Sequence, residues 1–315
     1  MRSLITIVFG LMLLVSTAAS QGNGNTGIVM INEETTGMLI AGANVVQMAD
    51  VDANLMGNNI LANQIVGLRI EDGDITGQSD GKTNAIQVAD LILNDTGNAN
   101  VDSQSVGIAQ VENDITIGNI TQMTVLQAND IGNENVVDQS SSSSAGIFFG
   151  FVEPNLLVNS ELKQTSILNA CVNGNTNNAV QEADQFIVDN TLTNSKIYEH
   201  ADINANILGN ENNLGLGRQG IFQIAGDNLL TSSWASQRVF LDEQSSGNLN
   251  DVSQLGRSFF FDNMLTTSTA LQSIDAKARV SGNDNTVDQN VDLISGGNNA
   301  VDGRITQIAD IETNS

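Results

Sequence analysis

The sequence predicts an all-β protein, a β-solenoid in which eight tandem modules of about 35–42 residues stack as β-arches. Three observations support this prediction. The dipeptide Gly-Asn recurs at near-constant intervals, short runs of alternating apolar and polar residues follow it, and no stretch keeps a helical spacing of apolar residues beyond two turns. A fixed period of this size is typical of repeat proteins, whose units are too small to bury separate cores and are stabilised by stacking.

Gly-Asn opens each module. Successive glycines of this dipeptide are 35, 40, 35, 42, 35, 38 and 35 residues apart, and 34 residues remain from the last of them to the end. Because Gly and Asn both tolerate positive φ, we expect the chain to reverse direction at this dipeptide. The module starts are Gly22, Gly57, Gly97, Gly132, Gly174, Gly209, Gly247 and Gly282.

The opening phrase extends to G-N-x-N-x-x-x-Q, and its glutamine is present in six of the eight modules. Equivalent strands of stacked coils pair about 4.7–4.9 Å apart, so identical side chains line up. We therefore expect ladders of side-chain amides, Asn over Asn and Gln over Gln. For the asparagines, turn chemistry alone is the alternative. The expected ladder residues are Gln64, Gln104, Gln139, Gln181, Gln254 and Gln289, with Asn100, Asn135, Asn177, Asn250 and Asn285.

Alternating runs after the motif, such as residues 135–139 and 304–308, predict strands. A second, looser Gly-Asn-Gln phrase follows within modules, as at residues 42–47, 81–87 and 118–122. A module is therefore either one wide coil with two similar sides or two narrow coils. The apolar stretches 146–151 and 259–261 are interpreted as buried strands, with a subunit contact as the alternative.

Residues 1–20 have the pattern of a secretory signal peptide: one arginine, an apolar run from Leu4 to Val15 and a small-residue cleavage region. The solenoid is assigned to residues 21–315, and no later segment is long enough to be a transmembrane helix. With 36 Asp+Glu against 11 Lys+Arg, the whole chain carries a formal net charge of −25. This acidity argues against nucleic-acid partners. The single cysteine, Cys171, is expected to be buried, with an intermolecular disulfide as the alternative.

Few residues suggest chemistry. The only histidine is His200, which excludes multi-histidine metal sites and histidine-based triads, and the acids recur with the module, so we expect no enzyme activity and no cofactor. Asp50, Asp52 and Asn54 offer spaced oxygen ligands and are weak candidates for calcium; a solvated acidic face is the alternative. Asn94 and Asn119 match the N-glycosylation pattern.

The phrase G-N-x-N-x-x-x-Q resembles the curlin repeat of functional amyloids. The signal peptide, the acidity and the high asparagine content make the chain similar to the sheath proteins of filamentous methanogenic archaea. That resemblance implies self-assembly into an amyloid-like extracellular sheath, fibril or cell-surface layer, with copies of itself and cell-surface components as partners. The alternatives are a calcium-dependent adhesin or carbohydrate-binding solenoid and, third, a polysaccharide-degrading β-helix enzyme.

Overall fold

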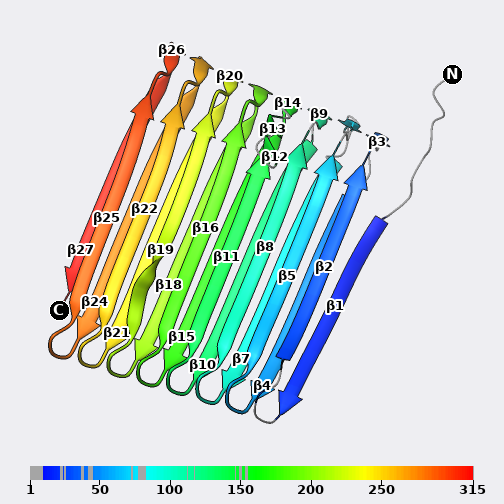
Figure 1. Ribbon diagram of the computed structural model, residues 1–315. Coiled ribbons are helices and arrows are strands. Elements are labelled where there is room, and N and C mark those ends of the chain that lie inside the picture. Colours follow the sequence, from blue (N-terminus) through cyan, green and yellow to red (C-terminus); the bar gives the residue numbers. More distant parts are fainter. Residues whose placement is uncertain are drawn as a thin grey trace.

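A computed structural model describes residues 10–314 except for 22–23, 25, 37–38, 42–44, 72–73, 77–82, 112, 117, 146, 149–150 and 153–154. The prediction of an all-β solenoid is confirmed: every regular element in this part of the chain is a strand, and three parallel sheets run side by side along the stack (Figure 1). Within the same residues there is accordingly no helix of the length and hydrophobicity that a membrane crossing needs.

Each module forms one wide coil, which decides between the two coil widths that the sequence left open. In the fifth module the chain runs along β16 (Asn178–Val188), turns through the short strand β17 (Thr191–Thr193) and returns along β18 (Lys196–Leu208). The next coil places β19, β20 and β21 directly beside these strands, all in parallel register. The two long strands of a coil thus belong to two facing sheets.

We call the sheets A, B and C. Sheet A contains β1 (Gly10–Gln21), β4 (Val45–Met56), β7 (Thr83–Thr96), β10 (Gly118–Ile131), β15 (Glu161–Asn173), β18, β21 (Trp234–Ser246), β24 (Thr269–Ser281) and β27 (Arg304–Asn314). Sheet B contains β2 (Thr26–Thr36), β5 (Leu61–Glu71), β8 (Val101–Val111), β11 (Val136–Ala145), β16, β19 (Asn213–Gly226), β22 (Asp251–Phe261) and β25 (Thr286–Gly296). Sheet C contains β3 (Leu39–Ala41), β6 (Asp74–Thr76), β9 (Asp114–Thr116), β14 (Leu156–Val158), β17, β20 (Leu229–Thr231), β23 (Met264–Thr266) and β26 (Asn299–Val301).

The core lies between sheets A and B. Side chains alternate along each long strand between the buried interior and the outer face, as the period of two requires. Each inward position forms a row along the stack. One row of sheet A, for example, contains Val51, Leu91, Leu126, Leu168 and Ile203, all fully buried. Small and medium aliphatic side chains suffice because each one packs against its own equivalent in the next coil.

The two apolar stretches have different positions. Of residues 259–261 in β22, only Phe260 is buried in the core, whereas Phe259 lies on the outer face with its ring centroid 5.1 Å from that of Phe222. Within residues 146–151, the described backbone forms a small antiparallel hairpin of β12 (Ile147–Phe148) with β13 (Phe151–Val152). The hairpin is an insertion in the fourth module, and it explains why that module is the longest.

The Gly-Asn turns stack as closely as the strands. Gly132 adopts φ 154° and donates its N–H to the carbonyl of Asn173 at 2.9 Å. A Cβ added to Gly132 would lie 1.5 Å from the carbonyl oxygen of Gly97 in the previous turn. The same approach recurs at the equivalent glycines from Gly97 to Gly282, so glycine is required here by contact between neighbouring coils as well as by φ. The first module's Gly22-Asn23 lies outside the described residues.

The N-terminal end includes part of the segment that the sequence analysis assigned to a signal peptide. Gly10–Gln21 forms β1, which pairs in parallel with β4 at one edge of sheet A. Removal of residues 1–20 would leave β4 as the edge strand of that sheet. At the other end of the stack, the edge strands are β25, β26 and β27.

Candidate functional site

A ladder of glutamines runs along the interior of sheet B. Gln139 is completely buried, its Nε2 donates to Gln104 Oε1 at 2.7 Å, and its own Oε1 accepts from Gln181 Nε2 at 2.7 Å. The ladder begins at Gln64, which accepts from Gln104 at 2.8 Å, and further along the stack Gln289 donates to Gln254 at 2.7 Å. In the sixth module, where the sequence motif has Leu216, β19 shifts register between Leu214 and Gln219, and Gln219 is in register with Gln254.

A second glutamine ladder lies inside sheet A. Gln87 donates to Gln47 at 2.8 Å and Gln164 donates to Gln122 at 2.8 Å, and towards the other end of the stack Gln307 donates to Gln272 at 2.9 Å. This ladder is not among those predicted from the sequence. Its signal was present in the looser Gly-Asn-Gln phrases, which contain Gln47, Gln87 and Gln122.

Between Gln47 and Gln307, Glu199 is the one position of the sheet A row that is not a glutamine. It lies in register between Gln164 and Gln237 and is 1% exposed. Burial raises its pKa well above the ordinary value of 4.5. Gln164 Oε1, the next acceptor in the row, has no donor, and a protonated carboxyl has an O–H to offer it. The neutral acid therefore substitutes for a glutamine.

We expect Glu199→Gln to stabilise the protein at neutral pH and to flatten its pH dependence. The unfolded state releases the Glu199 proton near pH 4.5, before the folded state does, so the free energy of unfolding falls as pH rises above that value. One such group contributes at most about 1.4 kcal/mol per pH unit. Denaturant unfolding at about pH 5 and about pH 8 measures the slope. Glu243, whose pKa burial also raises, remains in the variant, so part of the slope persists.

The control is Glu211→Gln at an exposed turn position, which should leave the slope unchanged. An equal slope in Glu199→Gln and the unmodified protein would contradict the neutral-acid interpretation.

The second asparagine of the turn motif does not form the Asn-over-Asn side-chain ladder that the sequence predicted. Instead it bonds to backbone in neighbouring turns. Asn135 Oδ1 accepts from the backbone N–H of Asn100 at 2.9 Å, and its Nδ2 donates to the carbonyl of Gly97 at 3.0 Å. The Oδ1 atoms of the equivalent asparagines accept in the same way along the stack. They can do so because a turn has backbone N–H groups without a strand partner, whereas those of a strand are paired in the sheet. The residues of this set are Asn100, Asn135, Asn177, Asn212, Asn250 and Asn285.

The first asparagine of the motif forms an exposed side-chain ladder. Asn133 Nδ2 donates to Asn98 Oδ1 at 3.2 Å, and the backbone N–H of Asn133 donates to the same oxygen at 2.9 Å. A further buried row of asparagines lies at the corner before sheet C, where Asn190 Nδ2 donates to Asn228 Oδ1 at 3.3 Å. Sequence reasoning missed this corner row, which contains Asn113, Asn155, Asn190, Asn228, Asn263 and Asn298.

The calcium candidates Asp50, Asp52 and Asn54 lie on the outer face of β4. Asn54 Nδ2 donates to Asp52 Oδ1 at 3.1 Å, and Asp50 is in register with Asp90, whose pKa is raised by burial and by the Asp50 charge. The structure does not bring these three residues into a group of converging carboxylates.

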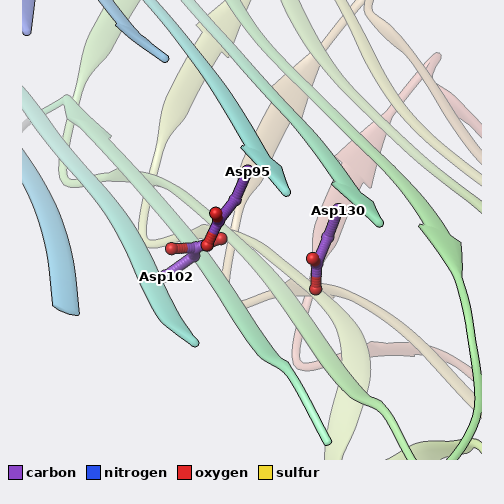
Figure 2. Close-up of side chains that lie close together, drawn as sticks. All are labelled: Asp95, Asp102 and Asp130. Atoms are coloured by element: carbon purple, nitrogen blue, oxygen red, sulfur yellow. The ribbon is translucent and has the colours of Figure 1, made fainter. Parts of the chain in front are cut away.

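One group of acids does converge among the described residues. It contains Asp95, Asp102 and Asp130, whose ligand atoms lie within 4.8 Å of one another (Figure 2). All three are buried between sheets A and B. Burial raises the pKa of Asp102 to about 9 and that of Asp130 to about 7, with neighbouring carboxylates adding to both shifts. The sequence offered a signal here, because each of these acids stands where other modules have an apolar residue.

The remaining single residues lie on the outer face of sheet A. Cys171 is exposed, which corrects the expectation that it is buried; it lies in an outward row in register with Asn129 and Asn206. Asn94 belongs to the same row and donates to Asn54 at 3.0 Å, while Asn119 donates to Asn84 at 3.2 Å. Both glycosylation candidates are thus paired within strands. His200 packs against Phe240, with ring centroids 5.4 Å apart.

The last coil leaves its interior open. Val291 and Leu293 of β25 pack against the core from one side only, and Ile311 of β27, in the row of the fully buried Ala276, is 50% exposed. Among the described residues, β25 and β27 each have a neighbouring strand on one side only. A long, straight strand edge of this kind is a template for pairing with another chain.

No protein-family model, curated protein or solved structure matches the chain.

Proposed function

We propose that this chain is an exported structural protein that polymerises end to end into an amyloid-like extracellular sheath, fibril or surface layer. The observation that supports it is the coil formed by β25, β26 and β27, which presents open strand edges and half-exposed core residues. Solenoids that remain monomeric need end coils with a polar outer surface. Here the last coil has the same apolar and amide rows as the interior coils, so it is suited to receive another coil.

The two ends match in register. Following the sheet A pairing from strand to strand, Gln307 of β27 lies in the row that starts at Gln47 of β4. After removal of residues 1–20, a second copy could place its β4 on β27 and its β2 on β25. The glutamine ladder of sheet A would then continue from one copy to the next, and the exported polymer would need no partner other than itself.

This junction also explains a role for the acids on β4. The same register places Asp310 over Asp50 and Glu312 over Asp52, with Asn314 over Asn54. Stacked like charges about 5 Å apart repel, and a divalent cation between the copies would neutralise them. Calcium therefore enters as an assembly ion at the junction between copies, in place of an ion held by Asp50, Asp52 and Asn54 within one chain.

The proposal predicts that Ile311→Lys abolishes polymerisation and leaves the monomer folded. In the monomer a lysine at this half-exposed position reaches water, but a second coil stacked on it would bury the ammonium group, which is strongly unfavourable. Polymer is measured by sedimentation and electron microscopy, and the fold by circular dichroism.

The matched control is Ile308→Lys, on the same strand and 52% exposed, but directed to the outer face. It should polymerise normally. If instead only Ile308→Lys blocks assembly, the copies associate laterally and do not stack end to end. A protein that stays monomeric in every variant and binds a glycan or cell surface with calcium would instead support the adhesin alternative.

A further inference from the structure

Three aspartates meet in the interior near the Gly-Asn turns. Asp95 lies near the end of β7 and Asp130 near the end of β10, adjacent strands of sheet A, and Asp102 lies on the facing strand β8 of sheet B. Figure 2 shows the carboxylates of Asp95 and Asp102 beside each other and that of Asp130 on the neighbouring strand. Each residue is 1% exposed, and the three ligand atoms are within 4.8 Å of one another.

These acids interrupt apolar rows. Asp95 and Asp130 are in register with Leu55 on one side and Val172 on the other. Asp102 lies between Ala62 and Val137. The neighbouring coils therefore show that aliphatic residues fit these positions. Breaks in a repeated core pattern that converge on one point are typical of functional or strained sites.

The protein satisfies these carboxylates poorly. No donor has good hydrogen-bond geometry to either oxygen of Asp95, to either oxygen of Asp102 or to Oδ2 of Asp130. The Asn100 side chain and the Thr96 backbone lie close enough to Asp95 to lower its pKa, but burial outweighs them. The remaining oxygen, Asp130 Oδ1, accepts from Asn135 Nδ2 at 2.6 Å. A buried polar atom without a partner is costly, and buried charges are normally paired or bound to a metal. The unpartnered Asp102 side chain reaches from the opposite sheet towards the two acids of sheet A, as a third ligand would.

We propose that Asp95, Asp102 and Asp130 bind one calcium ion inside the solenoid, between the second and third coils. The ligands are carboxylate oxygens alone, which hard divalent cations prefer. Calcium accepts six to eight oxygens in flexible geometry, whereas magnesium retains several of its waters, so a buried site of three carboxylates favours calcium. The ion would join sheet A to sheet B close to the turns, in a chain whose one cysteine excludes an internal disulfide.

This site is independent of the polymerisation proposal and of the acids on the outer face of β4. It is tested on the full chain at a concentration where it is soluble. The protein is unfolded in guanidinium with a chelator and refolded with calcium or with chelator. Bound metal is counted by elemental analysis after gel filtration, and the melting temperature is recorded in both states.

We expect refolding in calcium to retain about one ion per chain and to raise the melting temperature by about 5 °C when calcium is in about hundredfold excess over its dissociation constant. Asp102→Val should retain no ion and show no calcium-dependent shift. In chelator it should melt at or above the temperature of the unmodified protein, because the buried unpartnered carboxylate is gone and Val137 occupies the same row. Asp102→Asn preserves the volume and should also lose the ion.

The matched control is Asp138→Val, the same substitution on the outer face of β11, in the row where the next coil has Val180. It should keep both the ion and the shift. Two results would overturn the proposal. If the unmodified protein retains no ion and melts at the same temperature with calcium and with chelator, the cluster holds protons only. If Asp102→Val keeps the ion and the calcium-dependent shift, calcium binds elsewhere on the chain.

Discussion

Gly132→Ala is expected to prevent the chain from folding, or to destabilise it by more than about 4 kcal/mol, which is rare for the addition of a single methyl group. The new Cβ would lie 1.5 Å from the carbonyl oxygen of Gly97 and 2.8 Å from Asn135 Nδ2. Backbone of the neighbouring turn cannot yield without breaking the turn hydrogen bonds on both sides. At φ 154° an alanine is also strained whatever the space.

The contrasting variant is Gly107→Ala in β8, where an added Cβ meets nothing within 4 Å. It should change the free energy of unfolding by no more than about 1 kcal/mol, with stabilisation expected because alanine restricts the unfolded chain. Both variants are compared by circular dichroism and denaturant titration. Equal stability of the two would show that the turns do not stack as closely as the structure has them.

Gln139→Leu is expected to have the second large effect and to lower the free energy of unfolding by roughly 3 kcal/mol. Leucine is close to glutamine in size but breaks the bonds to Gln104 and Gln181, each 2.7 Å long, and the bond of Nε2 to the carbonyl of Asn169. Each buried partner left without its hydrogen bond lowers the free energy of unfolding by about 1–3 kcal/mol. The apolar side chain that replaces the amide offsets part of this loss. Denaturant unfolding at fixed pH measures the loss.

Gln244→Leu is its control, because Gln244 is exposed on the outer face of β21. It should change stability by less than about 0.5 kcal/mol. Matching losses in the two variants would mean that the buried amide ladder is not a source of stability.

The sequence predicted the solenoid because the period itself carries the information. From Gly57 to Gly282, Gly-Asn marks each turn from sheet A to sheet B, and the fixed offset of Gln104, Gln139 and Gln181 follows from parallel strands in register. Coil width did not follow, since two similar phrases per module fit one wide coil or two narrow ones. The structure resolves this through β17 and its equivalents, three-residue strands too short to have an alternating pattern.

The candidate sites were harder to predict, for physical reasons. Asn135 was assigned to a side-chain ladder, but at a turn the nearest unpaired groups are backbone, and these are invisible in a sequence. Asp95 and Asp102 are seven residues apart on different sheets, and Asp130 is one coil further on. Their convergence depends on the register between sheets, which no single-strand pattern specifies. The contrast with Leu55 and Val172 emerges only once the rows are aligned.

Stacking of whole chains in register is the central claim, and X-ray fibre diffraction from aligned polymer of the purified protein tests it most directly. We predict a reflection at about 4.7–4.9 Å along the fibre axis and one near about 10 Å across it. A further axial repeat of roughly 38 Å is expected, the height of eight coils spaced about 4.8 Å apart. A polymer whose 4.7 Å spacing runs across the fibre axis, or a protein that remains a soluble monomer at every concentration with and without calcium, would contradict the account.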